Sequence, residues 1–176
     1  ELQRTAIARA TPAGTIPTRT LGREGIEETA NAVSDAYRVA LDKIGTVKLD
    51  QQFLNSSPQI VQRAVALNPQ QKADVANVVE QVISSRVNPS QGVITADIAK
   101  TIDSDLGSYV REFSRSSQAS ERQAAGVVRE IQSQWRDLIR RNAPDTATAN
   151  MLDDANRAVA NLLRVEKASI KSGSQG

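Results

Sequence analysis

Residues 95–113 read TADIAKTIDSDLGSYVREF, and this stretch decides the fold class. Apolar side chains recur in it at steps of three and four residues, at Ile98, Ile102, Leu106, Tyr109, Val110 and Phe113. Because an α-helix turns once in about 3.6 residues, this spacing places them on one helical face. Thr95 is a good N-cap, so we predict that the helix begins directly after it. Gly107 costs this helix about 1 kcal/mol relative to Ala, and such a glycine often permits close approach of another backbone.

The same periodicity continues on both sides of this segment. It predicts a helix from Glu24 to about Gly45. It also predicts a long helix that ends before Asn142 and a last helix after it, with an apolar stripe of its own. The candidate caps of that last helix are Asp145, Thr146 and Thr148.

Residues 48–67 are less regular. We expect a short helical turn or extended link over Lys48–Leu54. Ser56 and Ser57 are then candidate caps for a short helix, with Pro58 at its first position, where the missing N–H of proline does no harm.

Asn68 and Pro69 predict the cap and the first residue of another helix. Its apolar residues are Val75, Val78, Val79, Val82 and Ile83. Their β-branched side chains make a strand the competing interpretation, although the sustained three-to-four spacing favours a helix. Asn88–Gly92 is a turn signal.

These segments predict an all-α fold, a bundle of five or six antiparallel helices that can also be elongated, with no convincing strand. We expect an irregular lead-in over 1–23, one helical bundle domain over 24–171 and a flexible tail over 172–176. Residue 1 is Glu rather than Met, so we expect a fragment or a processed product.

Composition argues against most enzyme chemistry. The chain has no Cys and no His, which removes disulfides, thiolate nucleophiles, the usual zinc ligands and the commonest general base. Apolar runs such as 64–67 are far shorter than the roughly 20 residues that a membrane-spanning helix needs. Aromatic residues are few, so the core should be thin. We predict no catalytic, cofactor-binding or metal-binding residues.

The acidic residues and glycines give no stronger signal. Asp103 and Asp105 near Glu112, and Glu27 beside Glu28, resemble carboxylate pairs most closely, but a solvated helix face explains them better. Gly22–Gly25 has no following Lys-Ser/Thr and fits a turn. Asp145–Asp154 is too sparse for a calcium loop.

One basic set stands out, although the net charge is only +2. It consists of Arg129, Arg136, Arg140 and Arg141, with Arg122, Arg111 and Arg115 as further candidates. Steps of seven and four place the first three near one helical face, where they can contact DNA or a partner. Because Glu130 and Asp137 lie on the same helix, an exposed face with ion pairs is the simpler interpretation.

Trp135 lies in the apolar stripe of the long helix, and we predict that it anchors the core. Tyr109 and Phe113, one helix earlier, are the other predicted core anchors and are near enough in the pattern to meet it. An interface role for Trp135 is the less frequent alternative.

The final helix carries the segment Leu152-Asp-Asp-Ala-Asn-Arg-Ala-Val-Ala-Asn-Leu-Leu-Arg-Val-Glu-Lys-Ala168. It resembles the end of the large helix-rich internal virion, or ejection, proteins of short-tailed bacteriophages. Ile16–Gly25, Asp35-Ala-Tyr37, Tyr109-Val-Arg111 and Asn142-Ala-Pro144 recur in those proteins in the same order. Those proteins often have Tyr where this chain has Val159.

The resemblance implies a structural role without catalysis. Such proteins lie inside the capsid near the portal, leave with the genome and help to form a DNA-delivery conduit across the host envelope. The implied partners are copies of the chain itself and other virion proteins. The implied location is the virion interior, then the host cell envelope.

Two other functions stay open on the sequence. A helical adaptor for a specific protein partner would show the same apolar stripes. A DNA-coating protein would use the arginine-rich helix face, and its binding would depend steeply on salt.

Overall fold

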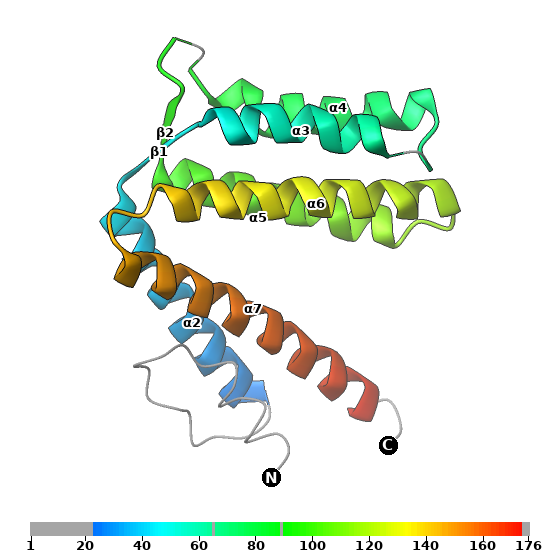
Figure 1. Ribbon diagram of the computed structural model, residues 1–176. Coiled ribbons are helices and arrows are strands. Elements are labelled where there is room, and N and C mark those ends of the chain that lie inside the picture. The colour runs from blue at the N-terminus through cyan, green and yellow to red at the C-terminus, as the bar shows by residue number, and fades with distance from the viewer. Residues whose placement is uncertain (1–22, 65, 89, 174–176) are drawn as a thin grey trace. The chain divides into compact units, whose positions relative to one another are not determined.

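The computed structural model describes residues 23–64, 66–88 and 90–173 (Figure 1). Its helices are α2 (Arg23–Ile44), α3 (Gln51–Arg63), α4 (Pro69–Val82), α5 (Ala96–Ser114), α6 (Ala119–Arg141) and α7 (Thr146–Gly173). The smaller elements are a 3-10 turn, η1 (Ser84–Arg86), and two strands, β1 (Thr46–Lys48) and β2 (Val93–Thr95). The predicted all-α fold is confirmed, with six α-helices in the described part of the chain.

The predicted ends of the chain lie mostly outside the described residues. Of the expected lead-in over 1–23, only Arg23 is described, and it is the first residue of α2. Of the expected tail over 172–176, Ser172 and Gly173 belong to α7.

By its internal contacts the chain divides into two compact units. The first consists of residues 1–43 and 143–176, and its described part is α2 and α7. The second consists of residues 44–142 and holds α3 to α6 with the two strands. That residues 24–171 act as one domain stays a prediction.

The first unit pairs α2 with α7, which run side by side in Figure 1. Its buried apolar residues are Val33, Tyr37, Ala40 and Leu41 of α2 and Ala149, Leu152, Ala155, Ala158, Leu162 and Val165 of α7. Ala158 is buried, whereas the neighbouring Val159 of the predicted stripe is half-buried. This core is built mainly from small aliphatic side chains, as the composition predicted.

Helix α7 begins at one of its three predicted caps. The carboxylate of Asp145 accepts the backbone N–H of Thr148 at 2.7 Å. That hydrogen bond is the main reason that the pKa of Asp145 lies below its ordinary value, because it favours the charged carboxylate.

The second unit is centred on the hairpin of α5 and α6. Leu106 and Ile102 of α5 and Ile131 and Leu138 of α6 are almost completely buried, as their stripes predict. Ile98 of the predicted stripe is 38% exposed, because the adjacent Ala99 turns toward the core instead. Thr95 caps α5 as predicted, since its hydroxyl accepts the N–H of Ile98 at 3.2 Å.

The predicted start of α3 is wrong. The helix begins at Gln51, and its cap is Asp50, whose carboxylate accepts the N–H of Phe53 at 2.9 Å. Pro58 therefore lies inside α3 rather than at its first position, and it has no N–H for the carbonyl of Leu54. The turn or link expected over 48–54 is the end of β1 and the first turn of α3.

Helix α4 confirms the prediction for its start. Asn68 accepts the N–H of Gln71 at 2.8 Å, and the Gln71 side chain accepts the N–H of Asn68 at 2.9 Å, with Pro69 as the first helical residue. This reciprocal capping box satisfies two N–H groups that the helix itself cannot pair. The competing strand does not form, because Val75 and Val78 are buried at helical spacing.

The small sheet is a correction to the expected absence of strands. Strands β1 and β2 pair antiparallel, with Val47 opposite Ile94 and both side chains buried. Three residues per strand are too few for an alternating pattern to stand out in the sequence. On the other edge of β1, the side-chain amide of Asn142 accepts the Lys48 N–H at 2.9 Å and donates to the Lys48 carbonyl at 3.1 Å.

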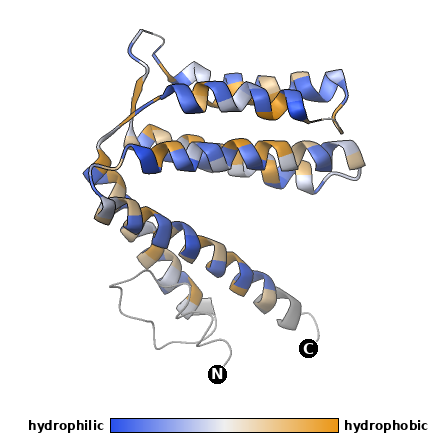
Figure 2. Cartoon of the chain, viewed as in Figure 1, coloured by the Kyte–Doolittle hydropathy of each residue, from blue (hydrophilic) through white to orange (hydrophobic). Residues whose placement is uncertain are grey.

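In Figure 2, hydrophilic and hydrophobic residues alternate along every described helix. In agreement with this pattern, no helix among the described residues has the length and apolar character required to cross a membrane.

Candidate functional site

Two of the acidic residues singled out in the sequence, Asp103 and Asp105, form ion pairs. Asp103 pairs with Arg136 at 2.8 Å, and Asp105 pairs with Arg86 at 2.6 Å. Arg86 and Asp105 line a polar hollow of about 440 Å³, together with Glu112. The described residues contain no group of three or more side chains suited to holding a metal ion.

The two loops considered for phosphate or calcium are parts of helices where they are described. Arg23–Gly25 form the start of α2, and Gly22 lies outside the described residues. Asp145 caps α7, and Asp153 and Asp154 lie within that helix.

The predicted basic set divides into two parts. Arg141 points toward the start of α3 and binds both carboxylate oxygens of Asp50, at 2.6 and 3.0 Å. This guanidinium is the largest cause that lowers the pKa of Asp50, with the Phe53 N–H adding to it. Arg141 is therefore a structural residue that joins the end of α6 to the cap of α3.

The other three arginines of the set, Arg129, Arg136 and Arg140, lie on one side of α6, and Arg122 lies on the same side. At about 100° per residue, these four are within roughly 40° of one another. Arg141 is about 100° further round the helix. Arg122, Arg129 and Arg140 are exposed, and Arg136 is half-exposed.

Helix α5 adds two cations beside this stripe. Its contact with α6 places Arg111 there: a Cβ at Gly107 would lie 3.1 Å from the Gln132 amide nitrogen and 3.5 Å from an Arg111 guanidinium nitrogen. Lys100 is about 20° from Arg111 around α5. We refer to these six cations as the basic face, which comprises Lys100, Arg111, Arg122, Arg129, Arg136 and Arg140.

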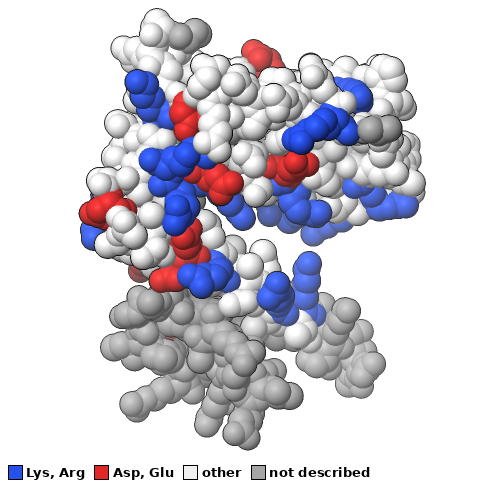
Figure 3. Space-filling model, in the orientation of Figure 1, with Lys and Arg blue, Asp and Glu red and all other residues white. Residues whose placement is uncertain are grey.

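Figure 3 shows Lys and Arg side chains gathered along the edge that α5 and α6 form. Asp103 lies within the basic face, and Asp97 lies beside it, in the first turn of α5. Around α6, Glu130 is roughly 80–120° from the four arginines, whereas Asp137 is roughly 60° from Arg122 and Arg140. Cations therefore outnumber carboxylates on this side of the hairpin, although the whole chain is nearly neutral.

Uncharged oxygens position two arginines of the basic face, Arg111 and Arg122. Arg122 donates to the carbonyls of Ser116 and Ser117 at 2.8 and 2.9 Å. Arg111 donates to the Ser108 hydroxyl at 2.9 Å. Such contacts hold a guanidinium in place without cancelling its charge, whereas the Asp103 carboxylate partly neutralises Arg136.

Gln132 and Gly107 form the seam beneath the basic face. The Gln132 amide donates to the backbone carbonyl of Asp103 at 3.0 Å and lies over Gly107, where a Cβ would crowd it. Gly107 thus admits a side chain rather than the second backbone that the sequence suggested.

The predicted core anchors are arranged differently from the expected cluster. Trp135 is completely buried, and its ring meets Phe53 edge-on, with centroids 5.2 Å apart and an angle of 73° between the ring planes. Tyr109 and Phe113 are half-buried, and the centroids of their rings are 6.0 Å apart. Phe53 was missed because it lies in the segment expected to be a link.

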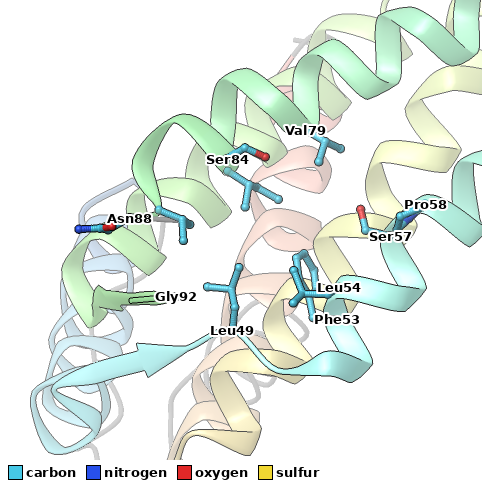
Figure 4. A pocket seen from close by; sticks show the side chains of 11 residues that line it. Leu49, Phe53, Leu54, Ser57, Pro58, Val79, Ser84, Asn88 and Gly92 are labelled. Carbon is cyan, nitrogen blue, oxygen red and sulfur yellow. The ribbon is translucent and has the colours of Figure 1, made fainter. Parts of the chain in front are cut away.

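An apolar groove lies between α3 and the α4–η1 segment (Figure 4). It encloses about 390 Å³ and is lined by Leu49, Phe53 and Leu54 on one side and Val79, Ile83 and Val87 on the other. Leu54 is 49% exposed, so the groove opens at its side chain. No sequence pattern indicated this groove, because it depends on where α3 begins.

Comparison with models of known families, with curated proteins and with solved structures finds no match to this chain.

Proposed function

We propose that this chain is a structural, non-enzymatic part of a bacteriophage internal virion protein, ejected with the genome and helping to form a DNA-delivery conduit across the host envelope. Two features support the proposal. One is the order of the segments from Ile16 to Ala168 that resemble such proteins. The other is the all-α fold, since the proteins that the chain resembles are helix-rich.

The observation that carries the mechanical part is the core of the first unit. Where α2 and α7 pack, four of the ten buried apolar residues described are alanines, Ala40, Ala149, Ala155 and Ala158. Small side chains bury little area each, at about 25 cal/mol per Å². A helix pair of this kind unfolds at low cost, passes through a narrow tail and forms again.

A force measurement tests this mechanical part. In an optical trap, we expect the first unit to unfold at low force and to refold on relaxation. Highly cooperative unfolding that resists mild force would contradict the proposal, because a unit that stays folded under mild force would not pass through a narrow tail.

The proposed partners are copies of this chain and other virion proteins near the portal. Exposed apolar side chains on the first unit, Val39 at 43% and Leu163 at 50%, suit contacts with another helix. The proposed location is the virion interior before infection and the host envelope afterwards.

Quantitative mass spectrometry tests the proposal as a whole. The chain should be present in intact phage particles and lost from particles whose DNA has been triggered to leave. Retention in the emptied particles would make it a fixed portal or tail component. Absence from both would remove the virion role.

The apolar groove favours a second candidate, a helical adaptor for a specific protein. Amphipathic helices bind such grooves through apolar anchors one turn apart. Leu54→Ser, at the mouth of the groove, should weaken capture of a partner if this candidate holds. In the virion role, the same change should leave incorporation into particles unaltered.

A further inference from the structure

We propose that the basic face of α5 and α6 binds the phosphate backbone of duplex DNA without reading its sequence. The inference stands on the geometry of this face. It does not depend on the virion role, so either proposal can fail while the other holds.

The length of the face suits several phosphates. From Arg122 to Arg140, α6 rises by about 27 Å at 1.5 Å per residue. Duplex DNA carries one negative charge per roughly 1.7 Å of its axis, so a straight row of cations of this length lies against many phosphates at once. Lys100 and Arg111 widen the row from the neighbouring helix.

The chemistry of the face also suits phosphate. Arginine presents a planar fork of N–H donors that matches phosphate oxygens. The contacts of Arg111 and Arg122 with neutral oxygens preorganise the two side chains and leave their positive charge in place. The Nε and Nη2 groups of Arg136 donate to the Asp103 carboxylate. The Nη1 group of Arg136 is left to donate to a phosphate.

The surroundings favour duplex DNA over a single strand. Proteins that bind single strands stack the bases on exposed aromatic rings. Trp135 is completely buried, and Tyr109 and Phe113 each lie roughly 160° from Arg111 around α5. The basic face therefore offers charge and hydrogen-bond donors but no ring for a base.

The same surroundings disfavour a membrane surface. Helices that lie in a membrane interface combine a basic side with a large apolar side that enters the lipid. The exposed apolar residue of the hairpin, Ile98, lies roughly 140° from Arg111 around α5 and stands apart from the basic face. A partner that needs only surface charge fits this arrangement better.

Fluorescence anisotropy with a short labelled duplex of mixed sequence tests the inference on the full chain. Binding should weaken steeply between about 50 and 200 mM salt, with a log–log slope near −4 for four to five phosphate contacts. A duplex of different sequence should bind equally well. Arg111→Gln with Arg129→Gln should reduce the slope by about 2, because each lost contact removes about one unit.

Arg63→Gln is the matched control, since Arg63 is an exposed arginine of the same unit that donates to a backbone carbonyl of α3. It should leave the slope unchanged. The single variant Arg129→Glu, at an exposed position, should weaken binding without loss of helix in circular dichroism.

Three results would overturn the inference. The first is no binding of the duplex at about 50 mM salt, where counterion release is strong. The second is an equal loss of binding in Arg63→Gln and in the double variant. The third is binding to vesicles of anionic phospholipid without binding to DNA, which would assign the face to membranes.

Discussion

The indole N–H of Trp135 donates a hydrogen bond to the backbone carbonyl of Ala99, 2.9 Å away, inside the buried contact of α5 with α6. Both residues are completely buried. The bond fixes the position of α6 along the axis of α5. The Asp103–Arg136 pair crosses the same interface one turn further along α5.

We expect Trp135→Ala to lower the free energy of unfolding of the second unit by about 3–5 kcal/mol, because it leaves a large cavity against Phe53. Trp135→Phe keeps much of the volume and should cost less, with about 1 kcal/mol from the lost hydrogen bond. Urea unfolding followed by circular dichroism measures both. A loss below about 1 kcal/mol for Trp135→Ala would contradict the role of this residue as the core anchor.

Gly107 and Gly126 form a matched pair for helix propensity. Gly126→Ala, in α6 with nothing within 4 Å of the new Cβ, should stabilise by about 1 kcal/mol. At Gly107 the new Cβ would lie 3.1 Å from the Gln132 amide, so the gain should be largely lost. In the Gln132→Ala background, Gly107→Ala should regain this stabilisation relative to Gln132→Ala alone, because the crowding amide is gone.

Unfolding in urea, followed by the fluorescence of the one tryptophan of the chain, gives these three free energies. The result that would exclude crowding is an equal stabilisation by Gly107→Ala and Gly126→Ala in the otherwise unchanged chain.

Asp50 and Arg141 predict a loss of stability in acid. The Arg141 guanidinium holds the pKa of Asp50 below its ordinary value of 3.8. Because the folded protein takes up this proton less readily than the unfolded chain, the stabilisation is complete above about pH 5 and is lost as the pH falls through the folded pKa. Arg141→Gln should raise the pKa and cost about 0.5–1 kcal/mol near neutral pH, since the pair is partly exposed.

Urea midpoints between about pH 3 and pH 7 check this prediction. The difference between the unchanged chain and Arg141→Gln should shrink toward the acid end, whereas Arg63→Gln should show no such trend. A difference that stays constant over the whole range would show that Asp50 is not the group involved.

Pro58 predicts a stabilising substitution. Pro58→Ala restores an N–H for the carbonyl of Leu54 inside α3 and should raise the free energy of unfolding by about 1–3 kcal/mol, less the entropy that the unfolded chain regains. Pro69→Ala is the control, because Pro69 is the first residue of α4 and needs no N–H there. It should be neutral or slightly destabilising. Equal effects of both changes would contradict this account.

Local signals allowed much of the fold to be predicted. The capping box of Asn68 and Gln71 lies within four residues, and the stripes of α5 and α6 repeat within a few turns. The start of α3 was missed because Ser56 and Ser57 before a proline resemble a cap as closely as Asp50 does. Only the packing of Phe53 against Trp135 distinguishes the two.

Only the part of the candidate site that lies on a single helix, α6, could be predicted from the sequence. The common side of Arg129, Arg136 and Arg140 follows from their spacing alone. The partners of Arg136 and Arg141 are 33 and 91 residues away in the sequence, so no local pattern could indicate them. For the same reason the sequence could not show that Arg141 binds the cap of α3 and does not belong to the basic face.

The side chain of Asn142 has a consequence for how copies of the chain meet. A free strand edge accepts a strand from another molecule and lets sheets grow without limit. At Lys48 the edge of β1 is already occupied on both its N–H and its carbonyl by one amide group, as if a third strand one residue long were present. While Asn142 keeps these two hydrogen bonds, a strand from another copy cannot pair with β1 at Lys48.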